Sequence, residues 1–236
     1  MAAEGARNGA EAEKRLAAAR AVELVRDGMV VGLGTGSTAS EAIRLLGERV
    51  KEGLKIRGIP TSEVTRKLAR ECGIPMVSLA DVPRVDVTID GADEIDPQMR
   101  LIKGGGGALL REKIVASASA MLVIIADATK VVQQLGAFPL PVEVVPFALP
   151  VVRRSIEKLG PKVVLRGGDS APYVTVDGNF ILDCAFRRIE DPETLAATLA
   201  AMPGVVESGL FLGMADMVVI GRADQVKIFK RPKAQN

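Results

Sequence analysis

The stretch DGMVVGLGTGSTASEAIRLLGERV, Asp27–Val50, runs from a turn through a short apolar segment and a glycine-rich loop into an amphipathic segment. The apolar segment predicts a buried strand that ends near Gly34, and the spacing that follows predicts a helix that begins at Ser37 or Thr38. Further strands are predicted at 54–62, 85–90 and 121–127, and further helices at 11–26, 63–73 and 107–120. Because strands and helices alternate, we expect an α/β fold with a parallel sheet covered on both faces.

The composition of the sequence changes after Lys130. Four prolines in FPLPVEVVPFALP, residues 138–150, indicate a connection between domains. The segment beyond it mixes two helical patterns with a strand pair around Asp177–Asn179, which predicts a smaller α+β domain over 135–205. The first domain is predicted to take residues 1–134 and about 206–236. Composition leaves open which sheet the last predicted strands, 205–211 and 215–221, join. Residues 1–10 are expected to be a frayed tail.

Composition restricts the possible chemistry, because the chain has 236 residues, a net charge of +2 and no histidine. Ser-His-Asp catalysis, Cys-His catalysis and zinc–histidine sites are excluded within this chain, so proton transfer near neutral pH would fall to carboxylates and lysines. The low net charge and the single tyrosine argue against a nucleic-acid partner. The apolar runs are too short to span a membrane. No signal peptide is predicted, and the two distant cysteines, Cys72 and Cys184, fit a reducing cytoplasm.

The loop VGLGTGSTA, Val31–Ala39, predicts an anion site between a strand and a helix. Glycines let the backbone approach an anion, and the helix N-terminal amides together with the hydroxyls of Ser37 and Thr38 donate hydrogen bonds to it. A tight turn with Ser/Thr capping is the alternative. Lys14, in the first predicted helix, either supplies a cation for a bound phosphate or is solvated.

The same loop matches the dinucleotide pattern G-x-G-x-x-A through Gly34, Gly36 and Ala39. That pattern requires an acid at the end of the next strand to bind the ribose, yet this strand ends in the residues Ile59–Ser62. A single phosphate is therefore a better ligand for the loop than a dinucleotide.

The loop TIDGADEID, Thr88–Asp96, holds four acids, the first of which is Asp90. Asp90 ends a buried strand, so it should face the crevice in which such folds bind ligands. Carboxylates at that position can hydrogen-bond sugar hydroxyls and move protons between them. Turn-forming acids, an exposed acidic loop and a magnesium site are the alternatives.

The stretch LIKGGGGALLREK, Leu101–Lys113, places Lys103 before four glycines and Glu112 in the helix that follows. Consecutive glycine amides form a concave nest for an oxyanion. A carboxylate, a cation and preorganised amides are what proton abstraction next to a carbonyl requires. For Glu112 the alternative is a surface charge, and Lys130 in the loop ADATK either holds a substrate oxygen or is solvated.

The motifs GTGSTA, DGADEID, KGGGGALLREKI, ADATK and FPLPVEVVP stand in the order and spacing of the ribose-5-phosphate isomerase A family, which the chain resembles over nearly its whole length. The resemblance implies a cytoplasmic enzyme of the pentose phosphate pathway that interconverts D-ribose 5-phosphate and D-ribulose 5-phosphate without a metal or an organic cofactor. It also implies a Rossmann-like domain, a smaller ferredoxin-like α+β domain, and assembly as a homodimer or homotetramer. One departure is ILDCAF, Ile181–Phe186, where the family has a more polar turn.

Carried onto the matching positions, the resemblance makes Glu112 the proton acceptor. Asp90 or Asp93 would open the furanose ring, and Lys103 would meet the charge of a cis-enediolate together with the glycine amides. The residues implied to contact the substrate are Thr35, Gly36, Ser37, Thr38, Asp90, Gly91, Ala92, Asp93, Lys103, Gly104, Gly105, Gly106 and Lys130. Lys14, selected from its place in the first predicted helix, is added to them as a further candidate cation.

Three other functions compete with an isomerase. A non-catalytic sugar-phosphate sensor would not need Glu112, but it would normally carry a DNA-binding helix-turn-helix, for which few residues precede the first predicted helix. A nucleotide-dependent oxidoreductase would use the G-x-G-x-x-A match. A magnesium-dependent protein would use the acidic loop.

Overall fold

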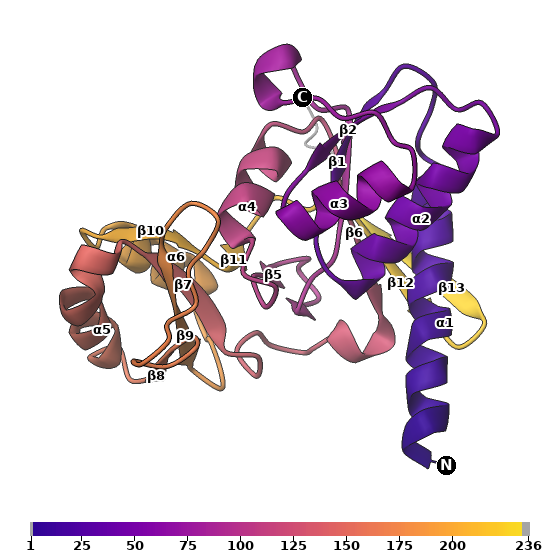
Figure 1. Ribbon diagram of the computed structural model, residues 1–236. Coiled ribbons are helices and arrows are strands. Elements are labelled where there is room, and N and C mark those ends of the chain that lie inside the picture. The colour runs from indigo at the N-terminus through magenta and orange to yellow at the C-terminus, as the bar shows by residue number, and fades with distance from the viewer. Residues whose placement is uncertain (1, 233–236) are drawn as a thin grey trace. The chain divides into compact units, whose positions relative to one another are not determined.

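The structure is a computed structural model that describes residues 2–232, with side chains described from residue 9 onward. The chain divides into two compact units (Figure 1). The first unit comprises the residues up to Ala92, Arg111–Val131 and the residues from Met214 onward. The second unit comprises Asp93–Leu110 and Val132–Gly213.

The first unit is built on a six-stranded sheet with the order β13-β12-β6-β3-β1-β2. All neighbouring strands pair in parallel except β13, which pairs antiparallel with β12. The strands are β1 Val30–Leu33, β2 Arg57–Pro60, β3 Val87–Asp90, β6 Leu122–Asp127, β12 Met217–Arg222 and β13 Gln225–Lys230. Every residue of β1, β3 and β6 is buried, as expected for strands covered on both faces. The predicted parallel sheet is confirmed.

The C-terminal strands divide between the two units, a choice that composition left open. Strand β12 adds to the first sheet beside β6, whereas β10 and β11, within the predicted strand 205–211, pair in the second unit. Strand β13 was not predicted, because the adjacent Ile228 and Phe229 interrupt an alternating pattern, and only Val226 is half-buried while the other residues are exposed.

Helices cover the sheet of the first unit: α1 Ala2–Val22, α2 Ser37–Lys51, α3 Glu63–Glu71 and α4 Leu109–Ser117, which begins in the second unit. Helix α1 packs against β6 and β12, and its approach to β12 is close enough that a Cβ on Gly221 would lie 2.6 Å from the carbonyl carbon of Glu13. The expected frayed tail is wrong for the described residues, since α1 begins at Ala2. Alanine-rich sequence has a high helix propensity, which outweighed the glycines in this segment.

The second unit holds a four-stranded antiparallel sheet with the order β10-β7-β9-β8 and a three-stranded sheet with the order β11-β5-β4. Their bounds are β4 Glu94–Ile95, β5 Leu101–Ile102, β7 Leu140–Val144, β8 Lys162–Leu165, β9 Phe180–Ala185, β10 Val205–Ser208 and β11 Leu210–Phe211. Helices α5, Leu149–Glu157, and α6, Pro192–Ala200, close an apolar core that includes Val142, Ile156 and Leu182. The α/β class with a second, smaller α+β part is therefore confirmed.

The domain boundaries of 1–134 with about 206–236, and of 135–205, stay a prediction. Residues 93–110 and 206–213 lie in the second unit, because β4, β5 and β11 pair with one another there. The strand pair expected around Asp177–Asn179 reduces to β9 and a single bridge between Val174 and Phe180.

Both cysteines are free thiols, and burial raises the pKa of the Cys184 thiol. Among the residues that the structure describes, no helix is both long enough and apolar enough to cross a membrane.

Candidate functional site

Three of the loops selected from the sequence leave the same edge of the first sheet. Leu33 of β1 is in register with Ile89 of β3, and Asp90 at the end of β3 is in register with Ile124 of β6. The loops after these parallel strands therefore emerge together, as the carboxyl ends of strands do in open α/β sheets.

The loop between β1 and α2, which contains Thr35, is hydrogen-bonded directly to Asp90 at the end of β3. The carboxylate oxygen Oδ1 of Asp90 accepts hydrogen bonds from the backbone N–H of Thr35 at 3.1 Å and of Gly91 at 2.7 Å. A Cβ on Gly34 would lie 2.6 Å from the Cα of Asp90 and would also collide with its carboxylate. Glycine at position 34 is thus required for the loop Val31–Ala39 to meet the loop Thr88–Asp96. The Asp90 side chain at this contact is buried, since the residue is only 1% exposed.

The hydroxyl of Thr35 is the centre of a small polar cage. Its Oγ1 lies 2.8 Å from the hydroxyl oxygens of Thr61 and Ser62 and 3.1 Å from that of Thr65. Thr61 and Thr65 in turn donate to the carbonyls of Leu33 and Gly34. The sequence implied Thr35 as a substrate contact, and in the structure its hydroxyl also holds the loop in shape.

The rest of this loop forms the start of helix α2. Gly36 has a φ of 115°, in the left-handed region that favours glycine, and it precedes Ser37, the first residue of α2. Ser37 is exposed and Thr38 is buried at 8% exposure. The first amides of this 15-residue helix have no partner within the helix and are suited to an anion.

Glu112 lies in the first turn of α4 and is 4% exposed. Helix α4 packs on the first sheet through Val115, which joins an apolar cluster with Val30, Ile59 and Val85. A buried carboxylate is unusual for a glutamate that serves only as a surface charge. The surface alternative for Glu112 is therefore excluded.

Lys130 lies in a 3-10 turn, η2 Ala128–Lys130, that follows β6. Asp127 caps this turn by accepting from the N–H of Thr129, and Glu13 of α1 accepts from the N–H of Ala128 at 3.1 Å. The other oxygen of Glu13 accepts from Ala223 at 2.8 Å, which fixes α1 to the β12–β13 turn as well. Lys14, the next residue of α1, forms an ion pair with Glu11 at 2.8 Å.

The glycine stretch and its lysine belong to the second unit. Lys103 follows β5, donates its backbone N–H to the carbonyl of Gly209 at 2.9 Å and is 3% exposed. Its ammonium lies 5.4 Å from the ring centroid of Phe211, within the range of a cation–π interaction. Gly104 has a φ of 104°, whereas Gly105 and Gly106 are exposed.

Asp93 is hydrogen-bonded directly to the glycine stretch. The N–H of Gly105 donates to its Oδ2 at 2.8 Å, and a Cβ on Gly105 would lie 2.7 Å from its Oδ1. The structure therefore brings Asp93 together with Gly105, as it brings Asp90 together with Thr35. Gly91 and Ala92, between the two acids, are half-buried.

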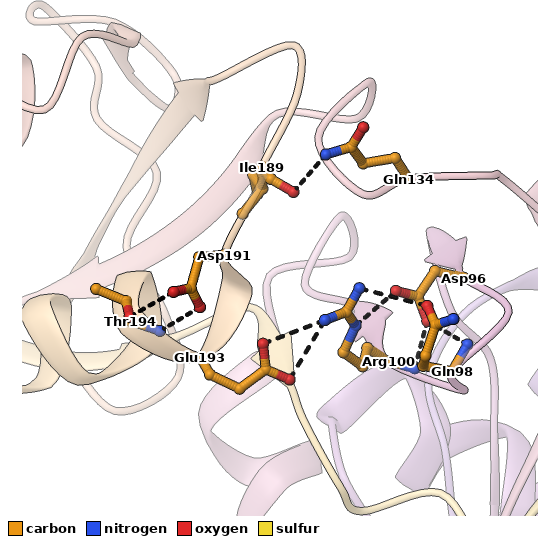
Figure 2. Close-up of polar contacts among 8 residues, drawn as sticks. All are labelled: Asp96, Gln98, Arg100, Gln134, Ile189, Asp191, Glu193 and Thr194. Atoms are coloured by element: carbon orange, nitrogen blue, oxygen red, sulfur yellow. Dashed lines mark hydrogen bonds and ion pairs between the residues drawn. The ribbon is translucent and has the colours of Figure 1, made fainter.

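The remaining acids of the DGADEID loop have structural partners. Glu94 accepts from the backbone N–H of Gly136 at 2.7 Å and of Phe138 at 2.5 Å. Figure 2 shows Asp96 bound to Arg100, whose guanidinium also reaches Glu193 at the start of α6. Among residues 9–232, whose side chains the structure describes, no three His, Cys, Asp or Glu side chains form a group that could hold a metal ion.

Sequence reasoning missed Arg166, which lies directly after β8. Its guanidinium donates to the carbonyl oxygens of Gly104 at 2.9 Å and Gly105 at 3.3 Å. The only signal in the sequence was an arginine at the end of a predicted strand, KVVLRG, and its partner glycines lie 62 and 61 residues away. Glu13 was missed for the same reason, since its partner Ala128 is 115 residues distant.

Comparisons with known proteins point to one family. The model of the family described as ribose 5-phosphate isomerase A (phosphoriboisomerase A) matches residues 57–225. The curated ribose-5-phosphate isomerase A of Nitrobacter hamburgensis is 53% identical over 228 residues, covering 94% of this chain and 98% of the relative. The solved structure of a D-ribose-5-phosphate isomerase in complex with phospho-erythronic acid has a TM-score of 0.91 and 41% identity, covering 94% of this chain and 99% of its own. That of ribose 5-phosphate isomerase A from Methanocaldococcus jannaschii has a TM-score of 0.88 and 44% identity, covering 92% and 98%.

Proposed function

The chain belongs to the ribose 5-phosphate isomerase A family, and from this we infer that it interconverts D-ribose 5-phosphate and D-ribulose 5-phosphate, a step of the pentose phosphate pathway. The observation that carries this function is the 53% identity to a curated member over 94% of the chain. A non-catalytic sugar-phosphate sensor is not favoured, since the high-coverage relatives are named as isomerases.

We propose that Glu112 is the base of this reaction. In the open-chain aldose, its carboxylate removes the proton on C2, the electrons of that bond form a C1–C2 double bond, and O1 becomes negative. Returning the proton from Glu112 to C1, while the proton of O2 passes to O1, re-forms a carbonyl at C2 and gives the ketose. The burial of Glu112 supports this role, because a nearly fully buried carboxylate is held in a defined position instead of turning into bulk solvent.

We propose that the loop Thr35–Thr38 holds the phosphate. Its support is the start of α2, where helix amides and the exposed Ser37 hydroxyl offer donors to an anion. Lys130 and Lys14 are proposed as further cations for the substrate. The fixation of the Lys130 turn to α1 through Glu13 supports a defined position for Lys130.

We propose that Asp90 or Asp93 opens the furanose ring by moving a hydroxyl proton, and that Gly91 and Ala92 line the substrate between them. Lys103 and the amides of Gly104, Gly105 and Gly106 are proposed to stabilise the oxygen charge of the cis-enediolate. The buried ammonium of Lys103 supports this, since a charge out of water acts more strongly on its neighbours. The bond from Gly105 to Asp93 makes the carboxylate of Asp93 part of the same group.

The test is a coupled assay that detects ribulose 5-phosphate formed from ribose 5-phosphate by the full-length chain in the presence of a chelator. We expect turnover that does not depend on added metal. Absence of turnover, with ribose 5-phosphate still bound in calorimetry, would favour a sensor, and turnover that the chelator abolishes would favour a metal-dependent enzyme.

We further propose a cytoplasmic location and assembly as a homodimer or homotetramer. Both rest on the resemblance to metabolic enzymes of this family. Light scattering coupled to size-exclusion chromatography should give two or four times the mass of one chain, and a monomer at assay concentration would contradict the assembly.

A further inference from the structure

Arg166 uses its whole guanidinium within the second unit. Its Nε and Nη2 bind the two carboxylate oxygens of Asp183 on β9 at 3.0 and 2.5 Å. Its Nη1 then donates to the carbonyls of Gly104 and Gly105. The side chain is 18% exposed, so these contacts are largely shielded from solvent. Such a bidentate pair fixes the plane of the guanidinium, and with it the direction of the third nitrogen.

Two peptide planes of the glycine stretch take their orientation from this third nitrogen. The carbonyl of Gly104 shares a peptide plane with the N–H of Gly105, and the carbonyl of Gly105 shares one with the N–H of Gly106. No peptide bond among the described residues is cis, so each N–H points opposite to its carbonyl. Carbonyls drawn toward Arg166 therefore turn both N–H groups away from it. The N–H of Gly105 accordingly reaches Asp93 at 2.8 Å.

A tyrosine adds to the same support. Tyr173, the only tyrosine of the chain, donates its backbone N–H to the carbonyl of Arg166 at 2.8 Å, and its ring centroid lies 5.9 Å from the guanidinium carbon. A Cβ on Gly107 would lie 2.7 Å from the Cζ of this ring. The glycine stretch is thus held by Arg166 at its first two residues and packed by Tyr173 at its last.

We propose that Arg166 is a positioning residue for the isomerisation: it turns the amide of Gly106 toward the reacting substrate and, through the N–H of Gly105, holds the carboxylate of Asp93 in place beside it. This inference rests on the proposed function. Glycine has no side chain to limit its backbone, so four consecutive glycines keep one arrangement of amides only if something outside the stretch selects it. Preorganised donors stabilise developing charge without reorganising during the reaction, which is why their orientation matters to the rate.

Lysine cannot replace arginine in this position. The ammonium of a lysine is a point charge, whereas the guanidinium presents five N–H donors in a fixed plane and can bind a carboxylate and two carbonyls at once. Arg166→Lys therefore keeps the charge and loses the geometry. Arg166→Gln loses both.

The experiment compares Arg166→Lys and Arg166→Gln with the matched control Arg100→Lys in the full-length protein. Arg100 lies in the same unit, is 23% exposed and pairs with Asp96 and Glu193, but it is not bonded to the glycine stretch in any interaction that the structure describes (Figure 2). We expect both Arg166 variants to lose kcat by about 10- to 100-fold with KM changed much less, because misplaced groups act on the transition state. The control should keep kcat within about twofold at a similar loss of Tm.

Two further measurements separate positioning from loss of structure. Guanidinium ion at millimolar concentration should restore part of the kcat of Arg166→Ala and none of the kcat of Lys103→Met. In spectra of protein labelled with ¹⁵N-glycine, the amides of Gly105 and Gly106 should shift in Arg166→Lys and stay in place in Arg100→Lys.

Wild-type kcat in Arg166→Lys, or an equal loss in the Arg100→Lys control, would overturn the inference. Unshifted amides of Gly105 and Gly106 in Arg166→Lys would overturn it as well, even if activity fell. Failure of the proposed function has a different signature, since the wild-type chain itself would then not form ribulose 5-phosphate.

Discussion

The two units differ in the kind of polar group they present. The first unit presents side chains: the carboxylates of Asp90 and Glu112, both buried, and the hydroxyl cage around Thr35. The second unit relies instead on the main-chain amides of a glycine stretch, one of which is bonded to the Asp93 carboxylate, together with the buried side chain of Lys103. The side chains of Asp90 and Glu112 are oriented by the strand and the helix that carry them. Main-chain amides on glycines have no such guide, and they depend on supports such as Arg166 that lie elsewhere in the sequence.

The largest expected effect comes from removing a side chain of the first kind. Glu112→Gln keeps the shape of the side chain and removes its basicity, so we expect kcat to fall by about 10²–10⁴-fold with little change in the binding of ribose 5-phosphate. The measurement is the coupled assay. Glu157→Gln, on the exposed face of α5, is the matched control and should keep wild-type activity. A near-normal kcat in the Glu112→Gln protein would show that Glu112 is not the base of the reaction.

The next effect concerns the close approach of Gly34 to Asp90, which holds two loops of the first unit together. Gly34→Ala would place a Cβ against the backbone and carboxylate of Asp90, and neither is a flexible end that can move aside. We expect a loss of about 3 kcal/mol of unfolding free energy, at the upper end for overpacking, and a raised KM. Urea denaturation measures the free energy of unfolding, and steady-state kinetics measure KM. Gly9→Ala meets nothing within 4 Å and lies in helix α1, so it should not destabilise the protein and should add up to about 1 kcal/mol through its higher helix propensity.

A smaller effect is expected at the hydroxyl cage. Thr35→Val keeps the shape of the side chain but leaves the hydroxyls of Thr61, Ser62 and Thr65 without their common partner. We expect a loss of about 1–2 kcal/mol of unfolding free energy, measured by urea denaturation. Thr198→Val, at a half-buried position of α6 in the second unit, loses only a bond to a helix carbonyl and should change stability by less than about 0.5 kcal/mol. Equal losses in the two variants would mean that the cage adds nothing beyond ordinary helix contacts.

The smallest effect tests a buried carboxylate of the second unit, Glu143. Burial raises its pKa above the ordinary 4.5, nearby Asp177 and Glu207 raise it further, and hydrogen bonds from Thr175 and Asn179 oppose the shift. A group whose pKa is raised in the folded state stabilises that state. The full contribution is present when the pH is below the pKa of the unfolded state, and it is lost as the pH rises through the pKa of the folded state.

The Tm of the wild-type protein minus that of Glu143→Gln should therefore fall as the pH is raised from below 4.5 to neutrality. Activity should follow the same small changes in stability and no more, since Glu143 has a structural role. A Tm difference that rises with pH would show that the carboxylate is stabilised in its charged form.

The sequence predicted the elements that follow local rules. Strands and helices alternate from Asp27 to Asp127, so the parallel sheet, and the edge at which its loops emerge, could be predicted from periodicity and the direction of parallel strands. Asp90, at the end of β3, was placed correctly for this reason. The start of α2 at Ser37 followed from the glycine and hydroxyl pattern before it.

The parts that could not be predicted depend on interactions between distant residues. Strand β13 is an edge strand with little buried surface, so it leaves no clear apolar pattern. The hydrogen bonds of Glu13 with Ala128, and of Arg166 with Gly104, join residues separated by 115 and 62 positions, and each is one charged residue among many. Helix α1 begins at Ala2, although residues 1–10 were expected to form a tail. In this segment alanines favour a helix and glycines oppose it, so helix propensity alone gave no clear prediction.

The central claim is that the Glu112 carboxylate takes up the carbon-bound proton of the pentose phosphate. Its most direct test is to incubate wild-type protein and Glu112→Gln with ribose 5-phosphate in D₂O and to follow deuterium at C1 and C2 by NMR, after calorimetry has confirmed that both proteins bind ribose 5-phosphate. The account predicts deuterium uptake with the wild-type protein and none above background with Glu112→Gln. Uptake at the wild-type rate in the Glu112→Gln protein would contradict it.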